Sequence, residues 1–210
     1  RVLSQDILTR FPYTTLFRSD FASCGYALCI VDTGGSHSDL TDEYAAVRKE
    51  MESVAEYLGK SVLREVDEDE FMKNIADIRS SCGDRAVLRA MHFYGDNARV
   101  EKQAAALKAG DFETFKKYII ESGRSSYMYN QNVYSCKKAS EQPVSLALSL
   151  SEKLLDGCGA WRVHGGGFAG TIQAFVPLNK LDEYKDLMEK VFGSGSCYIL
   201  SVRPVGGVEL

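Results

Sequence analysis

The sequence predicts an α+β fold in which helices pack on one face of an antiparallel sheet. Two observations indicate this class. Short apolar runs typical of strands alternate with segments of helical periodicity, and their order is strand, helices, strand, loop, strand, helix, strand. The composition fits as well, because 45% of the 210 residues are hydrophobic and 26% are charged, as in ordinary globular domains.

Each expected strand is a short run of apolar or alternating residues. The first ends at the turn sequence Asp32-Thr33-Gly34-Gly35, and another follows a glycine-rich stretch. The last is separated from the preceding helix by Gly193-Ser194-Gly195-Ser196. The strands for which bounds are predicted lie at 26–31, 171–177 and 197–203.

The helices are expected from apolar residues at three- and four-residue spacing. Thr41 or Asp42 can cap the first of them, and Asp111 can cap a later one that follows Gly110. On the first helix, the apolar stripe consists of Tyr44, Val47, Met51, Val54 and Leu58. The helices are predicted to begin at 41 or 42, to cover about 68–78 and 84–108, to begin again after 111, and to cover 142–156 and about 179–192.

A run of glycines precedes the strand at 171–177. Gly165, Gly166 and Gly167 are consecutive, and Gly170 follows three residues later. Glycine tolerates positive φ and lets a backbone approach a ligand or another strand closely. Successive N–H groups in such a turn can also attract an anion such as phosphate. The run therefore predicts either a phosphate-facing loop or a tight connection between two packed strands.

Three further segments carry recognisable motifs. One runs from Ile30 to a Glu-Tyr pair ending at Tyr44, and the others cover Ala86 to Val100 and Ser201 to Leu210. Together with the string from Arg162 to Pro177, these segments resemble the GHMP kinase family, and within it the galactokinases. The resemblance runs from about residue 20 to the C-terminus, and several separate segments agree on it.

The resemblance implies that 20–210 form a GHMP kinase C-terminal domain, a ferredoxin-like antiparallel sheet with inserted helices. It implies a sugar kinase that uses ATP and Mg²⁺ to phosphorylate the anomeric hydroxyl of α-D-galactose. Tyr44 would bind the sugar, and Gly165, Gly166 and Gly167 would lie beside the triphosphate. No catalytic residue and no metal site are expected in this chain. The phosphate loop and the sugar-acting arginine and aspartate belong to an N-terminal domain whose motifs do not occur here.

Several alternatives stay open at this point. Tyr44 is also the first apolar position of a helix, and core packing alone would explain it. The chain could belong to a non-catalytic relative that senses galactose and ATP, or to a kinase for another sugar such as N-acetylgalactosamine. Residues 118–138 mix polar and aromatic side chains without a period. A solvated connection is favoured there over the lining of a sugar cleft.

Polar residues near the motifs allow structural and functional interpretations alike. Arg162 can pair with a phosphate or with structural partners beside Trp161, and His164 can touch a ligand or make a structural hydrogen bond. Asp32 and Asp39 are the carboxylates nearest the first motif. Neither is expected to be the catalytic base.

The N-terminal segment is set apart from the predicted domain. Residues 11–19 resemble the translation of a common sequencing adapter, and residues 1–10 match no part of the family. Residues 1–19 are therefore expected to be non-native. The alternative is a genuine strand, because phenylalanine, tyrosine and threonine favour extended structure.

Charge and cysteine content exclude several function classes. The net charge of −4 provides no broad basic field, which argues against nucleic acid or an anionic membrane as partners. No segment approaches the roughly 20 apolar residues of a membrane-spanning helix. The six cysteines form no C-x-x-C pair, so a zinc site is not expected, and we predict reduced thiols in a cytoplasmic protein.

Overall fold

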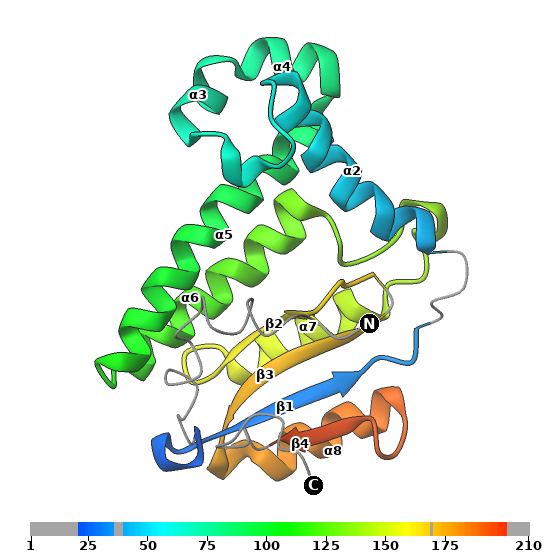
Figure 1. Cartoon of the computed structure of the whole chain (residues 1–210). Helices are drawn as coiled ribbons and strands as arrows, with labels where there is room; N and C mark the ends of the chain where they lie inside the picture. The colour runs from blue at the N-terminus through cyan, green and yellow to red at the C-terminus, as the bar shows by residue number, and fades with distance from the viewer. Residues whose placement is uncertain (1–20, 36–39, 169, 201–210) are drawn as a thin grey trace, which may run out of the picture.

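The computed structural model describes residues 21–35, 40–168 and 170–200, and its elements are shown in Figure 1. Residues 1–19, Asp39 and the motif at 201–210 lie outside the described residues. The strands are β1 (Tyr26–Asp32), β2 (Ala160–His164), β3 (Thr171–Pro177) and β4 (Cys197–Leu200). The α-helices are α2 (Thr41–Tyr57), α3 (Glu68–Lys73), α4 (Ile75–Cys82), α5 (Asp84–Lys108), α6 (Phe112–Ser125), α7 (Pro143–Leu155) and α8 (Leu181–Phe192).

The described strands form one antiparallel sheet in the order β2-β3-β1-β4. The strand β1 is central, and its Val31 lies opposite Ile172 of β3 and Cys197 of β4. Successive side chains of a strand point to opposite faces, and every second residue of β1 is buried. This order and direction of strands is that of the ferredoxin-like sheet, so the expected α+β fold is confirmed.

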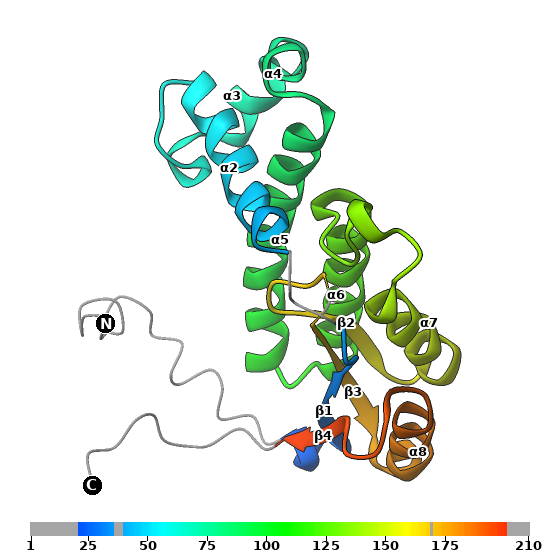
Figure 2. The same cartoon turned by 90° about the vertical axis from the view of Figure 1, so that its right-hand side faces the viewer.

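Helices α7 and α8 cover one face of the sheet, as Figure 2 shows with the sheet seen nearly edge-on. Val144 and Leu155 of α7 and Met188 of α8 pack there against the buried side chains of the strands. Among the described helices, α6 packs on the opposite face, at one end of the sheet. There, Phe115 and Ile119 of α6 pack against Ala160 and Phe175. The expectation of helices on one face therefore holds for α7 and α8, whereas α6 lies on the other face.

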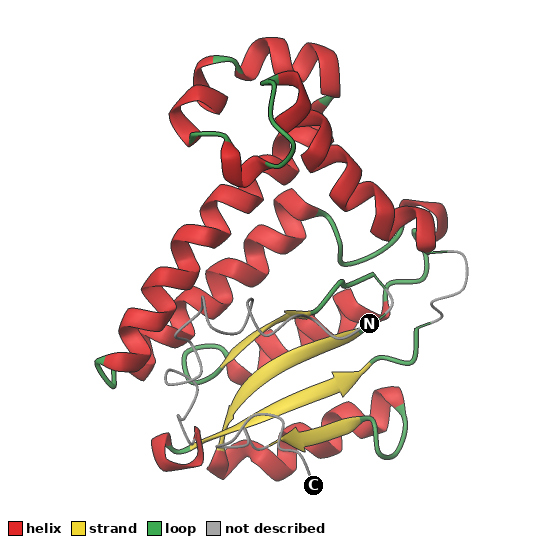
Figure 3. Cartoon of the chain, viewed as in Figure 1, coloured by secondary structure: helices red, strands yellow, loops and turns green. Residues whose placement is uncertain are grey.

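The inserted helices α2 to α5 extend away from the sheet and form a second core (Figure 3). Val54, Phe71, Ile78 and Ala90 are buried at its centre. The long helix α5 packs against α6 along its length and so joins this second core to the sheet. The start of α2 comes back toward the sheet, and Tyr44 there lies next to the glycine loop, residues 165–168.

Two helix boundaries differ from the expected ones. Thr41 and Asp42 lie in the first turn of α2, and the N-cap position is Leu40, which makes no side-chain capping hydrogen bond. The acidic helix expected over 68–78 is divided at Asn74 into α3 and α4. By contrast, Asp111 accepts a hydrogen bond from the backbone N–H of Thr114, so the capping predicted for α6 is confirmed.

The segment 118–138 is not the solvated connection that its sequence predicts. Helix α6 continues to Ser125 and passes into a π-helical turn, η4 (Ser126–Asn130). Ser126, Asn130, Asn132 and Val133 are all buried. The mixed polar sequence is explained by hydrogen bonding inside the fold, which gives no simple period.

All six cysteines are free in the structure, with Cys29 and Cys197 buried on neighbouring strands. The adjacent Cys197 thiol, through a hydrogen bond, and then burial raise the pKa of Cys29 far above its ordinary value. Among the described helices, none is both long and apolar enough to cross a bilayer.

Replacing Ile172 with alanine should lower the free energy of unfolding by about 2–5 kcal/mol, because a fully buried side chain at the sheet centre is lost. The matched control is Ile199→Ala, at a half-exposed position on the edge strand, which should stay within about 0.5 kcal/mol. Urea unfolding followed by circular dichroism measures both. Equal losses in the two variants would contradict this description of the core.

Candidate functional site

The first motif and the glycine loop meet at one edge of the fold. Strand β1 and strand β3 are paired up to Asp32 and Thr171, so the chain leaves β1 beside the turn that joins β2 to β3. Just beyond this pair, the Thr33 hydroxyl donates to the Gly170 carbonyl at 2.7 Å. The glycines therefore connect two packed strands and also face the start of α2.

Tyr44 lies on the first turns of α2 and reaches the glycine loop. Its hydroxyl donates a hydrogen bond of 2.9 Å to the Gly167 carbonyl, across 123 residues of sequence. Its ring meets the Phe168 ring edge-on, with centroids 5.0 Å apart. Burial raises the pKa of Tyr44, so its hydroxyl is protonated near neutral pH and available as a donor.

Two of the three consecutive glycines are required by neighbours within the protein. A Cβ on Gly166 would lie 2.7 Å from Cε1 of Tyr44. A Cβ on Gly167, which has φ +80°, would overlap the backbone carbonyl of Asn132. Gly165 also has positive φ but faces open space. Packing within the protein thus explains why positions 166 and 167 are glycine. Gly165 has no neighbouring atom within 4 Å on its open side.

Asn132 is a contact of the loop that sequence reasoning missed. Its side-chain amide donates to the Gly166 carbonyl at 3.2 Å, and its backbone carbonyl accepts from the Phe168 N–H at 2.5 Å. Phe168 has φ +60°, a left-handed conformation that is uncommon outside glycine. No local pattern marks Asn132, because its importance comes from a contact 34 residues further along the chain.

Two cavities adjoin this arrangement. Tyr44 lines one of about 470 Å³, whose other walls are mainly apolar and come from α2, Leu63 and Phe93. Phe168 lines the second, of about 670 Å³, together with polar residues that include Thr33 and Ser135. Tyr44 and Phe168, whose rings are in contact, thus line an apolar cavity and a more polar one respectively. Both volumes are in the range of small-molecule sites.

The remaining polar residues near the motifs have structural partners. Arg162 donates to Ser122 at 2.6 Å and lies against α6, away from the loop. His164 is exposed and hydrogen-bonded to Thr171. Asp32 accepts from the Gly34 N–H, which fixes the turn after β1. Glu43, the neighbour of Tyr44, is buried and accepts from the Ser135 hydroxyl at 2.8 Å.

In the part of the chain that the structure describes, histidine, cysteine, aspartate and glutamate side chains form no group of three that could hold a metal ion. The site can bind a ligand, because a protonated tyrosine hydroxyl, an aromatic face and exposed glycine backbone meet at one place.

Comparison with known proteins adds a family to this geometry. The galactokinase of Homo sapiens is 31% identical over 184 residues, covering 88% of this chain and 44% of the human protein. The galactokinase of Actinobacillus pleuropneumoniae serotype 5b is 26% identical over 164 residues, covering 78% of this chain and 41% of the relative. This chain is a relative of the galactokinases. No family model matches it.

A solved structure agrees on the fold. The crystal structure of Lactococcus lactis galactokinase complexed with galactose superposes with a TM-score of 0.65 at 21% identity, covering 89% of this chain and 47% of that one. The chain thus spans less than half of each of these relatives. This coverage is consistent with the C-terminal portion of a galactokinase, as the motifs predict.

The glycines should differ sharply in their tolerance of alanine. Gly167→Ala should reduce the free energy of unfolding by several kcal/mol, because its Cβ overlaps a buried backbone carbonyl at positive φ. Gly165→Ala should cost about 1 kcal/mol, since only the backbone conformation is strained. Chemical unfolding of the two variants measures the difference. Equal destabilisation would contradict the packing of the loop on Asn132.

Proposed function

We propose that this chain is part of an ATP-dependent sugar kinase that transfers the γ-phosphate of ATP to the anomeric hydroxyl of α-D-galactose. The single observation that carries the proposal is the contact between Tyr44 and the glycine loop. Two segments that separately resemble galactokinase motifs, 123 residues apart, are joined there by a 2.9 Å hydrogen bond. Relatives named galactokinase support the family, and one solved relative is described as complexed with galactose.

In this proposal, Tyr44 forms one wall of the sugar site. Its hydroxyl already donates to Gly167, and a hydroxyl oxygen has lone pairs that can still accept a hydrogen bond from a sugar hydroxyl. Its ring supplies an aromatic surface, and sugars commonly present their apolar face to such a surface. The residue thus binds and orients the acceptor, and it moves no proton of the reaction.

The glycine loop would border the triphosphate. Gly165 and Gly166 are exposed, and the absence of side chains lets a phosphate approach their backbone. Gly165 fits this role better than Gly166, since its open side meets no neighbouring atom within 4 Å. Phosphoryl transfer depends mostly on positioning and on charge stabilisation, for which ATP would bring Mg²⁺. We assign this chain no step through that ion.

Tyr44→Ala should weaken galactose binding by the chain at least about fivefold, because both a hydrogen-bonding hydroxyl and an apolar face are lost. Saturation-transfer NMR with galactose, N-acetylgalactosamine and glucose measures the binding and ranks the sugars. The matched control is Tyr57→Phe, an exposed tyrosine on the same helix, which should bind as the native chain does.

Galactose binding that is absent, or that is unchanged in Tyr44→Ala, would contradict the sugar-facing role. A preference for N-acetylgalactosamine would change the acceptor and keep the kinase class. The chain alone is expected to show no galactose-dependent ATP consumption. Such consumption would contradict the assignment of the chemistry to residues outside this sequence.

A further inference from the structure

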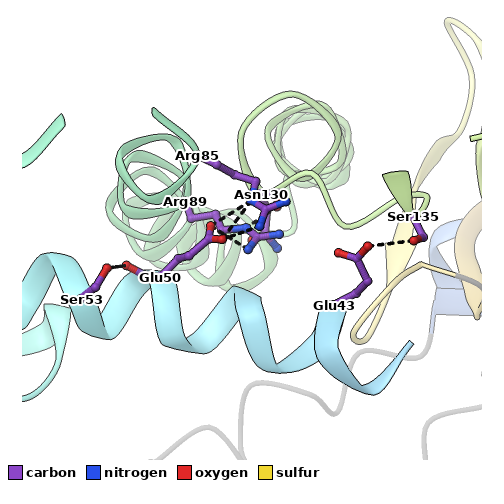
Figure 4. A network of polar contacts seen from close by, with 7 residues as sticks. All are labelled: Glu43, Glu50, Ser53, Arg85, Arg89, Asn130 and Ser135. Carbon is purple, nitrogen blue, oxygen red and sulfur yellow. Dashed lines mark hydrogen bonds and ion pairs between the residues drawn. The ribbon is translucent and has the colours of Figure 1, made fainter. Parts of the chain in front are cut away.

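An ionic cluster lies between α2 and α5 (Figure 4). Arg89 of α5 is fully buried and donates to the Glu50 carboxylate of α2 at 2.8 Å. Arg85, one turn earlier on α5, binds the same carboxylate at 3.0 Å and is partly exposed. Burial lowers the pKa of Arg89, and Glu50 opposes that change, so the guanidinium stays charged.

Arg89 has a second partner outside the helices. Its Nε donates to the backbone carbonyl of Asn130 at 3.0 Å. Asn130 is the last residue of η4, and Gln131 after it adopts the left-handed conformation with φ +54°. The guanidinium therefore binds the chain at the point where the π-helical turn ends and reverses direction. Asn132 follows two residues after this contact.

Asn132 carries that constraint to the glycine loop. Only 4% of the residue is exposed, and it contacts the loop through both its side-chain amide and its backbone carbonyl. The Gly167 carbonyl of the loop in turn accepts the hydrogen bond from the Tyr44 hydroxyl. Since Tyr44 and Glu50 both lie on α2, the contacts close a ring that begins and ends on one helix.

We propose that Asn132 is a positioning residue of the candidate site, which holds the glycine loop where the Gly167 carbonyl orients the Tyr44 hydroxyl. Arg89 acts through Asn132 by fixing the turn that precedes it. Asn132 touches no ligand in this account. The consequence for sugar binding rests on the proposed function, whereas the consequence for Tyr44 does not.

The chain offers a matched pair of variants. Asn130 and Asn132 are both buried in the same turn, but only the side chain of Asn132 bonds to the loop. The side-chain oxygens of Asn130 and Asn132 both have no hydrogen-bond partner among the described residues, so the two side chains differ in the bond that Asn132 donates to Gly166. Asn132→Ala and Asn130→Ala thus remove equal groups with different connections. Asn132→Asp is a second test variant, since it keeps the shape, removes the donor and brings a carboxylate oxygen against the Gly166 carbonyl.

The readout is the ring-carbon NMR signal of Tyr44 in the full chain labelled with ¹³C-tyrosine, assigned by its loss in Tyr44→Phe. In Asn132→Ala and Asn132→Asp this signal should move by more than its linewidth, and galactose binding should weaken about fivefold. In Asn130→Ala both should stay as in the native chain. Arg89→Lys keeps a positive charge but loses the planar fork, and it should move the signal in the same direction.

The two hypotheses fail separately. A Tyr44 signal that is unchanged in both folded Asn132 variants would overturn the positioning role, whatever the sugar does. An equal shift in Asn130→Ala would also overturn it, because the effect would then be general loosening of the turn. A native chain that binds no galactose, with the Tyr44 signal still moved by the Asn132 variants, would overturn the proposed function and leave the positioning role supported.

Discussion

The close approach of the glycine loop to helix α2 is the constraint on which the candidate site depends. Gly166 leaves room for the Tyr44 ring, and Gly167 leaves room for the Asn132 carbonyl while offering its own carbonyl to the Tyr44 hydroxyl. A side chain at either position would separate the two motifs. The same glycines close the β2–β3 connection, so one turn serves the sheet and the site together.

The inserted helices α2 and α5 are connected to the glycine loop by specific contacts. They extend away from the sheet, yet the Glu50–Arg89 pair and the Asn130 carbonyl connect them to the loop over the sheet edge. Desolvation of the buried Arg89 offsets much of its attraction to the partly exposed Glu50, but removing Glu50 would leave the buried guanidinium without its counter-charge. The pair is thus better understood as fixing one arrangement of α2, α5 and η4 than as the source of stability.

Much of the fold could be predicted from the sequence, because apolar periodicity reports burial directly: strand 171–177 and helix 84–108 have the predicted bounds. Boundaries were wrong where tertiary contacts decide them, as at Asn74 between α3 and α4. Tyr44 and the glycines were found through motifs. Asn132 was not. Arg89 and Glu43 lie inside motif segments, but their contacts with Asn130 and Ser135 could not be predicted, since each partner lies dozens of residues away and neither period nor composition marks such pairs. The segment 118–138 was misjudged for the same reason.

The central claim is that Tyr44, Asn132 and the glycine loop form one cooperative unit. A double-mutant cycle on the free energy of unfolding, with Tyr44→Phe, Asn132→Ala and the double variant, tests it most directly. Because the two side chains share the loop as a partner, the account predicts that their effects are non-additive by at least about 0.5 kcal/mol. Additivity within about 0.3 kcal/mol would contradict it, and would mean that Tyr44 and Asn132 touch the loop independently.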